Sequence, residues 1–207
     1  MFVRPCWRPA SENEGMELID RNPWALLVSN GVDGPLATNL PLLIDRKRRG
    51  EKVLFGHIAR ANAHWSRLRV SSGNALAIFE GPWSYVTASW YPNRDMPSTY
   101  YYTAVHCYGR LEWQTEEELD RSLETLTQRM EGPIHGGWAT NEIPRSEITR
   151  RFASIEGFWF HVERMEAKFK LGQDEPPSDA LAVAERLEEG NPELARMIRE
   201  QNASRAT

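Results

Sequence analysis

Cysteine is scarce in this sequence, and the spacing of the few cysteines excludes the common structural metal sites. Cys6 and Cys107 are the only two cysteines, they lie about a hundred positions apart, and neither belongs to a CxxC pair or to the Cys/His spacing of a zinc site. We therefore expect two reduced, buried and inert thiols.

Long apolar runs are also missing. The longest stretches, such as Trp24–Ser29 and Phe158–Val162, are far shorter than the roughly 20 residues that a membrane span needs. The first residues, Met-Phe-Val-Arg-Pro-Cys-Trp, lack the basic region and the apolar run of a secretory signal. The sequence therefore predicts a cytoplasmic protein with no membrane partner.

The chain has no excess of positive charge. Its 25 Lys and Arg residues are scattered and its formal net charge is −4, so no basic stripe is available to neutralise a phosphate backbone. We expect no nucleic-acid partner. A length of 207 residues, 41% of them hydrophobic, is enough for one globular domain with a substantial core.

Aromatic side chains, in contrast, are abundant. The chain contains eight Trp, six Tyr and seven Phe. Large flat side chains are typical of the lining of a site for a flat ligand. An aromatic-rich core without a ligand is the alternative explanation.

Short strands joined by turns account for much of the hydrophobic pattern. Alternating apolar residues and Gly- or Pro-containing turns predict strands, which favour a closed antiparallel barrel because it has no exposed sheet edges. The expected strands are Trp24–Ser29, Leu36–Ile44, Lys52–His57, Asn74–Glu80, Tyr85–Ala88, Tyr101–Trp113 and Phe158–Glu163. The predicted fold class is mainly β with flanking helices.

Helical periodicity and capping residues predict the flanking helices. These are expected over Ser11–Arg21, over Ala61–Arg69, after a Thr115/Glu118 capping box, from Pro144, from Ser178, and after Asn191 as N-cap. Glu14 is expected to complete a capping box with Ser11. The stripe formed by Leu119, Leu123, Leu126 and Met130 is expected to pack in the core. We divide the chain into a cofactor-binding domain, 1–177, and a helical tail, 178–207.

Several motifs follow one another in a fixed order. They are Gly56-His-Ile-Ala-Arg-Ala-Asn62, Gly81-Pro-Trp-Ser-Tyr-Val86, Ser89-Trp-Tyr91, Ala104-Val-His106 with Gly109-Arg110, and Lys168-Phe-Lys-Leu-Gly-Gln173. Together they resemble the motif set of the PaiB-like family, commonly labelled an FMN-binding negative transcriptional regulator. The resemblance implies a split β-barrel of the pyridoxamine-phosphate-oxidase type, a homodimer, and a cofactor cleft between the subunits.

The resemblance also implies positions for a flavin. In flavin-binding relatives the strand that contains Thr38 and Asn39 runs along the ring, and the turn from Gly56 to Asn62 approaches the phosphate. Free N–H groups at a helix N-terminus suit an anion, and Arg60 would add a charged fork. The alternative is that Gly56 and Asn62 only shape a turn.

At position 64 the chain departs from the common family pattern. Many PaiB-like proteins have Pro-Gln-Trp after the Ala-Asn pair, whereas this chain has Ala63-His64-Trp65. A similar Ala-Asn-x-His-Trp stretch occurs in the heme-dependent piperazate synthases of the family, where the histidine can be the axial iron ligand. The resemblance therefore implies heme b held by His64 as its metal ligand, with FMN as the alternative cofactor. Without this resemblance, the expected role of His64 is that of a core histidine whose ring nitrogens have protein partners.

The remaining candidate residues come from segments expected to face the cleft. His57 and His106 are alternative iron ligands or polar groups on the opposite side of the cofactor. Tyr91 or His106 would act as a proton donor. Lys168 and Lys170, one face of a strand-like segment, would bind heme propionates or a substrate carboxylate. Trp65, Trp90 and Gln173 complete the cofactor-binding set. Satisfied strand histidines, solvated lysines and ordinary aromatic packing are the alternatives.

The branch resemblance implies a heme-dependent enzyme that forms N–N bonds. Its substrate would be a small N-hydroxylated amino acid such as N5-hydroxyornithine, which loses water as a second amine attacks. The alternative is an FMN-binding PaiB-like regulator or flavin redox protein, and a heme carrier or heme-degrading protein on the same barrel is a third possibility.

Overall fold

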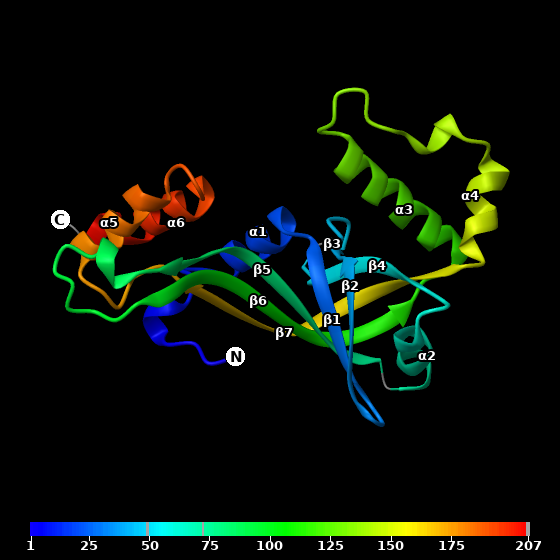
Figure 1. The fold of residues 1–207 in the computed structure, drawn as a ribbon. Helices are drawn as coiled ribbons and strands as arrows, with labels where there is room; N and C mark the ends of the chain where they lie inside the picture. Colours follow the sequence, from blue (N-terminus) through cyan, green and yellow to red (C-terminus); the bar gives the residue numbers. More distant parts are fainter. Residues whose placement is uncertain (49, 72, 206–207) are drawn as a thin grey trace. The chain divides into compact units, whose positions relative to one another are not determined.

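The computed structural model describes residues 1–48, 50–71 and 73–205. Their strands form one seven-stranded sheet in the order β2-β1-β5-β6-β7-β4-β3 (Figure 1). The strands are β1 (Trp24–Gly31), β2 (Gly34–Pro41), β3 (Leu43–Ile44), β4 (Val53–Ala59), β5 (Asn74–Val86), β6 (Thr99–Trp113) and β7 (Ile155–Lys170).

Helices precede, interrupt and follow the strands. The α-helices are α1 (Glu12–Arg21), α2 (Ala63–Val70), α3 (Glu116–Glu131), α4 (Arg145–Phe152), α5 (Pro177–Leu187) and α6 (Pro192–Asn202). Short 3-10 helices are η1 (Pro5–Trp7), η2 (Ala88–Trp90), η3 (Thr140–Glu142) and η4 (Ala203–Arg205). No helix among the described residues is both long and apolar enough to cross a membrane.

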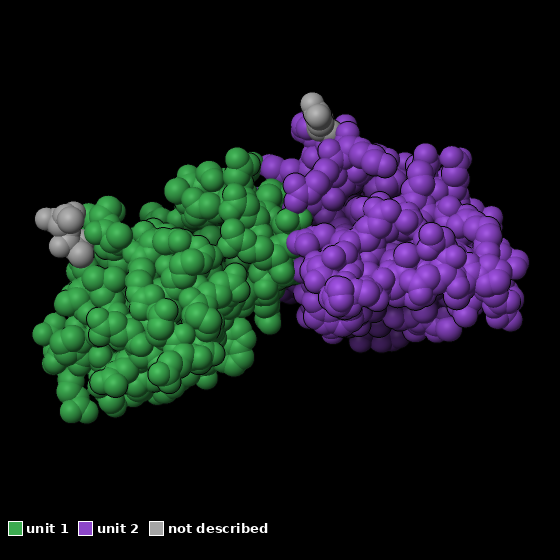
Figure 2. Space-filling model, turned by 90° about the horizontal axis from the view of Figure 1, so that it is seen from above, with its two compact units in different colours: residues 1–22, 79–106, 166–207 green, residues 23–78, 107–165 purple. Residues whose placement is uncertain are grey.

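The chain divides into two compact units, coloured separately in Figure 2. Unit 1 comprises residues 1–22, 79–106 and 166–207, and unit 2 comprises residues 23–78 and 107–165. Strands β5, β6 and β7 each contribute residues to both units. The division into 1–177 and 178–207 stays a prediction, and residues 206 and 207 of that tail lie outside the described residues.

The core of unit 2 follows from the alternation of its strands. Ala25 and Leu27 on β1 are fully buried, and β1 pairs with β2 in antiparallel register from Trp24↔Pro41. On the other side, β4 pairs with β7, with Gly56 opposite Phe158. The start of α2, which follows β4 in the chain, contacts β2 of the β1–β2 hairpin.

The core of unit 1 joins α1 to the C-terminal helices and to parts of the long strands. Ile19 of α1, Phe79 of β5, Val183 of α5 and Ile198 of α6 are all fully buried. Helices α5 and α6 lie side by side (Figure 1). The tail that the sequence predicted as helical is therefore packed on apolar side chains.

Most of the predicted elements are confirmed, and the Thr115/Glu118 capping box and the Asn191 cap are present. Strands β5 and β7 are longer than predicted: β5 joins the two expected pieces, and β7 continues to Lys170. The Ser11/Glu14 capping box is wrong, because the Glu14 carboxylate instead accepts the backbone N–H of Ala10 at 3.3 Å.

Two predictions of burial are also wrong. Within the apolar stripe of α3 only Leu119 is buried, whereas Met130 is 39% exposed, because the C-terminal end of that helix lies away from the sheet (Figure 1). Cys107 is buried as predicted, but Cys6 is exposed, since it lies in the short η1 helix near the N-terminus.

Candidate functional site

Helix α2 begins with a side-chain cap that also reaches the neighbouring hairpin. The Oδ1 atom of Asn62 accepts the backbone N–H of His64 at 2.9 Å, which satisfies a donor that a helix start leaves free. The Nδ2 group of Asn62 donates to Oγ1 of Thr38 on β2 at 3.1 Å. Asn62 thereby fixes the first turn of α2 against the strand.

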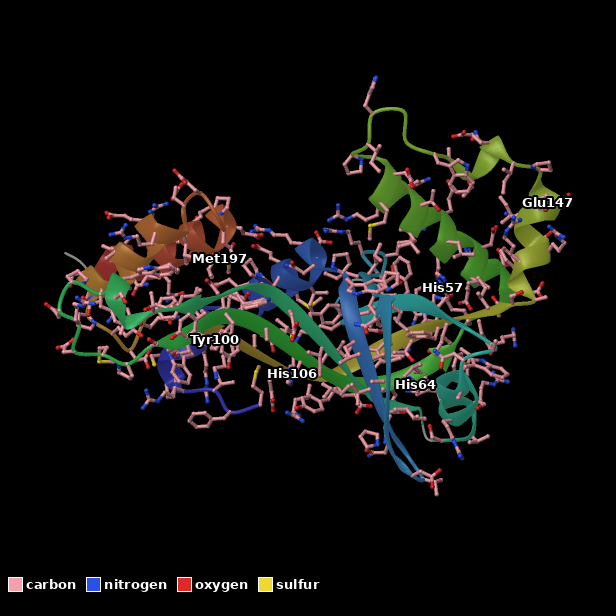
Figure 3. The ribbon with its side chains drawn as sticks, viewed as in Figure 1. His57, His64, Tyr100, His106, Glu147 and Met197 are labelled. Atoms are coloured by element: carbon pink, nitrogen blue, oxygen red, sulfur yellow. The ribbon has the colours of Figure 1, made fainter. Side chains whose placement is uncertain are left out.

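The imidazole of His64 is held at both ring nitrogens. Nε2 lies 2.9 Å from Oγ of Ser29 on β1, and Nδ1 lies 2.9 Å from Oγ1 of Thr38 on β2. Only 2% of His64 is exposed, and burial lowers its pKa because a poorly solvated site disfavours the charged form. His64, labelled in Figure 3, is therefore a neutral and oriented imidazole at neutral pH.

The hydroxyl of Thr38 leaves two tautomers of His64 open. A threonine hydroxyl has one donor and two acceptor positions, and one acceptor position is used by Asn62. If Thr38 donates to Nδ1, Nε2 carries the proton and donates to Ser29. If Thr38 accepts from Nδ1, the lone pair of Nε2 is available, and Ser29 donates to it.

A second cluster in unit 2 surrounds the carboxylate of Glu156 on β7. Glu156 is 8% exposed and accepts hydrogen bonds from the indole N–H of Trp65, from Arg60 at 3.3 Å and from Arg69 at 3.1 Å. The Arg60 guanidinium also lies 5.7 Å from the centroid of the Trp65 ring. Because two guanidiniums share one carboxylate, the cluster keeps a net charge of about +1.

The other predicted residues of unit 2 lie around this region in different settings. A Cβ atom at Gly56 would lie 2.8 Å from the carbonyl oxygen of Pro41, so close packing of the chain itself requires this glycine. His57 is half-buried, and burial lowers its pKa. Asn39 is exposed, on the face of β2 opposite to Thr38.

In unit 1, the predicted proton donor Tyr91 belongs to a buried cluster. Its hydroxyl donates to Oε1 of Glu175 at 3.1 Å, and the hydroxyl of Tyr101 donates to Oε2. Burial is the first cause that raises the pKa of Glu175 and of both phenols. Tyr91, 2% exposed, therefore has its hydrogen committed to a carboxylate, and the preceding Trp90 is half-buried in η2.

The two predicted lysines both lie on β7 and face the same indole. The Nζ atoms of Lys168 and Lys170 lie 4.5 and 5.6 Å from the centroid of the Trp7 ring, and Lys168 lies 4.9 Å from that of Tyr102. An ammonium group over an aromatic face is attracted by the ring quadrupole. Lys170 also donates to the hydroxyl of Thr99, so the two lysines share a face, as the sequence predicted.

Gln173 and His106 complete the predicted set. The amide of Gln173 accepts the backbone N–H of Leu171 at 2.7 Å and donates to the carbonyl of Phe169 at 2.6 Å, so it closes the turn that follows β7. His106 is half-buried on β6, and burial is the main cause that lowers its pKa.

The predicted residues thus fall into two groups, and each group belongs to one unit. Those in unit 2 are Thr38, Asn39, Gly56, His57, Arg60, Asn62, His64 and Trp65. Those in unit 1 are Trp90, Tyr91, His106, Lys168, Lys170 and Gln173. In unit 2 direct contacts join His64, Thr38 and Asn62.

The sequence prediction missed Ser29 and Glu156, which hold the central side chains of unit 2. A signal for Ser29 existed, because it continues the inward alternation of Ala25 and Leu27 and so places a hydroxyl at a buried position. Glu156 shares its face of β7 with Phe158, which likewise marks a buried polar group. Buried polar groups need partners, so both positions were candidates for a polar network.

An antiparallel sheet with flanking helices and an oriented, neutral imidazole at the start of a helix defines a candidate cofactor-binding protein of the mainly-β class. Residues 1–164 match the family model described as "Putative FMN-binding domain". The chain belongs to this PaiB-like, FMN-binding family.

Three similar proteins support the family and the fold. The "Protease synthase and sporulation protein PAI 2" of Bacillus subtilis is 27% identical over 198 residues, which cover 95% of this chain and 94% of the relative. The conserved hypothetical protein Rv2991 of Mycobacterium tuberculosis has a TM-score of 0.58 at 14% identity, covering 82% of this chain and 91% of its own. A FAD and heme binding protein from Mycobacterium smegmatis has a TM-score of 0.55 at 18% identity, covering 79% of this chain and 73% of that protein.

These comparisons confirm the predicted family and the predicted split-barrel fold with flanking helices. They support a cofactor-binding protein, and the family description names FMN.

Proposed function

We propose that this protein is a heme-dependent enzyme that forms an N–N bond from an N-hydroxylated amino acid, with His64 as the iron ligand. The observation that carries the proposal is the hydrogen-bonded chain Asn62–Thr38–His64, which orients a buried, neutral imidazole. Protein ligands of metals are commonly oriented in this way through the ring nitrogen that does not bind the metal.

Nε2 is the ring nitrogen of His64 that we propose as the iron ligand. In the tautomer whose Nδ1–H is donated to Thr38, the Nε2 lone pair faces only the hydroxyl of Ser29. A serine hydroxyl turns aside by a change of one side-chain torsion, and the lowered pKa of His64 keeps the imidazole unprotonated. Coordination therefore requires Ser29 to release Nε2, and this requirement can be tested.

Heme held by His64 would supply Lewis-acid chemistry for breaking the N–O bond of the hydroxylamine. The chain's own residues would position the substrate and move its proton. The side chain of Arg60 is 41% exposed, and Arg60 is the proposed partner of the substrate carboxylate. Tyr91 is unsuited to donate a proton, because its hydroxyl would first have to break its bond to Glu175.

The second candidate is an FMN-binding PaiB-like regulator or flavin redox protein, which the family description and the Bacillus subtilis relative favour. Its phosphate would bind near Arg60 and the start of α2. At that helix start Asn62 already accepts the backbone N–H of His64, so one of the donors that a phosphate would use is occupied.

The absorption spectrum of the purified protein, before and after addition of hemin or FMN, separates the two candidates. We expect a Soret band that His64→Ala abolishes or shifts, with hemin binding weakened at least about tenfold. His161→Ala is the matched control, because His161 pairs with Glu112 at the surface of the same unit. A wild-type protein that binds only FMN, or an unaltered heme spectrum in His64→Ala, would overturn the heme proposal in favour of the flavin candidate.

Two further variants test the geometry itself. Ser29→Ala removes the competitor for Nε2 and should preserve or tighten hemin binding, whereas Thr38→Val removes the group that orients Nδ1 and should weaken it. Conversion of N5-hydroxyornithine, followed as the loss of one water by mass spectrometry, then tests the reaction. If Ser29→Ala lost heme as His64→Ala does, iron coordination at Nε2 would be refuted.

We also propose that the protein is a cytoplasmic homodimer, as its family resemblance implies. Sedimentation of the cofactor-loaded protein measures the assembly, and a monomer with fully bound cofactor would contradict it.

A further inference from the structure

A groove of about 380 Å³ lies in unit 1 between α1 and α6, and its lining includes none of the residues assigned to the cofactor. Its lining includes the apolar side chains of Leu18, Phe169 and Leu171, which are packed into the core of the unit. Met197, labelled in Figure 3, adds a flexible apolar side chain from α6. The volume lies within the range of about 300–1,000 Å³ typical of sites for small molecules.

The rim of this groove, the α1–α6 groove, is acidic on both walls. Four glutamates and two arginines line it. The arginines are already neutralised, since Arg196 binds both carboxylate oxygens of Glu200 at 2.7 Å and Arg21 lies 3.7 Å from Glu17. The other two glutamates carry the uncompensated charge.

These two are Glu14 on α1 and Glu193 in the first turn of α6, and they stand on opposite walls. The only hydrogen bond of Glu14 among the described residues comes from the backbone N–H of Ala10, which leaves its charge in place. Glu193 forms no ion pair within the described part of the chain. The groove therefore combines apolar side chains in its lining with two negative charges.

We propose that the α1–α6 groove binds a small organic cation, an ammonium or guanidinium group carried on an apolar body. The apolar body would cover Leu18, Phe169 and Leu171, and the cation would lie between Glu14 and Glu193. A negatively charged ligand of the same shape meets repulsion from both walls. The proposal does not depend on the identity of the cofactor.

Three matched probes test the charge preference: hexylammonium, hexanoate and hexanol, titrated into the full-length protein and followed by ligand-observed NMR. Hexylammonium should bind, with a Kd that rises at high salt because the carboxylates are exposed. Hexanol should bind more weakly and hexanoate not measurably. Equal binding of hexanoate and hexylammonium would overturn the proposal, as would an absence of binding by hexylammonium.

Variants locate the site. Glu193→Gln should weaken hexylammonium binding about two- to fivefold, the effect of one exposed charge pair. Glu189→Gln is the control, because Glu189 is also exposed and loses the same charge, but it lies outside the groove. Met197→Lys places a cation inside the groove and should abolish binding, while circular dichroism verifies the fold.

Binding in the α1–α6 groove should be independent of the cofactor. Hexylammonium should leave the absorption spectrum unchanged, and His64→Ala should leave the Kd of hexylammonium unchanged. Equal losses in Glu193→Gln and Glu189→Gln, or full binding by Met197→Lys, would refute the assignment of the α1–α6 groove.

Discussion

Replacement of Tyr101 by phenylalanine tests whether the buried Glu175 is held by its two phenols. Tyr101 is fully buried, and its hydroxyl donates to Oε2 of Glu175. Tyr101→Phe keeps the ring and removes this donor alone. A hydrogen bond to a charged group contributes about 1.5–3 kcal/mol, and leaving a buried acceptor without its donor costs a similar amount. We therefore expect the free energy of unfolding to fall by about 2–3 kcal/mol at pH 8.

The pH dependence gives this prediction its sign. Burial raises the pKa of Glu175, while the phenols lower it because they stabilise the carboxylate. Tyr101→Phe removes one stabilising phenol, so the folded-state pKa rises further and the variant loses more stability as the pH rises. At pH 4 the carboxyl is protonated in the folded state, and the expected cost falls to about 1 kcal/mol, that of a neutral hydrogen bond.

Urea unfolding followed by tryptophan fluorescence and circular dichroism measures both quantities. Tyr85→Phe is the control, because Tyr85 is 49% exposed and its loss of a hydroxyl should change stability by less than about 0.5 kcal/mol. A cost for Tyr101→Phe no larger than that of Tyr85→Phe, or a cost independent of pH, would show that Glu175 is not held as the structure indicates.

Three further predictions follow from burial and close packing. Burial raises the pKa of Cys107 to about 12, so iodoacetamide at pH 8 should label only the exposed Cys6 in the native protein and both thiols in urea. Gly109→Ala should abolish folded expression, because its Cβ would overlap a backbone carbonyl oxygen of β7, whereas Gly190→Ala should not, since no described atom lies within 4 Å of its Cβ. Burial lowers the pKa of His64, so its stabilising effect is complete above about pH 6.5 and is lost as the pH falls; His64→Gln should flatten the decline of the urea midpoint between pH 7 and pH 5.

The sequence predicts the strands well where their two faces differ. In β1 the alternation of Ala25 and Leu27 with more exposed residues indicates one buried face. This pattern can be recognised in the sequence without knowing the partner strand. The same alternation is missing at the C-terminal end of β7, where Lys168 and Lys170 continue the strand with charged side chains. Their ladder partners and the face of Trp7 stabilise a segment that looks polar in the sequence.

Helix α3 shows the opposite error. Its apolar stripe has the right period for a core-facing helix, yet the exposed Met130 shows that period alone does not supply a partner for the last turns. Periodicity describes which side chains share a face of a helix. The length of the surface beneath that face depends on strands that are distant in sequence.

The candidate site could be predicted only in part because its key partners are remote. The local motif places His64 two residues after the Asn62 cap, and local chemistry is enough to predict that contact. The hydroxyls that hold the ring come from positions 35 and 26 residues earlier, in two strands whose register the sequence does not fix.

The orientation of α2 has an equally remote cause. Trp65, Arg60 and Arg69 all converge on Glu156, a single carboxylate of β7 that is about 90 residues away in the chain. Helical period puts Trp65 and Arg69 on one face of α2, but it cannot show that both donate to the same carboxylate. Because Glu156 is buried and shared, its loss would leave two guanidiniums and an indole N–H without their acceptor. The position of His64 therefore depends on a residue that touches neither its ring nor its cap.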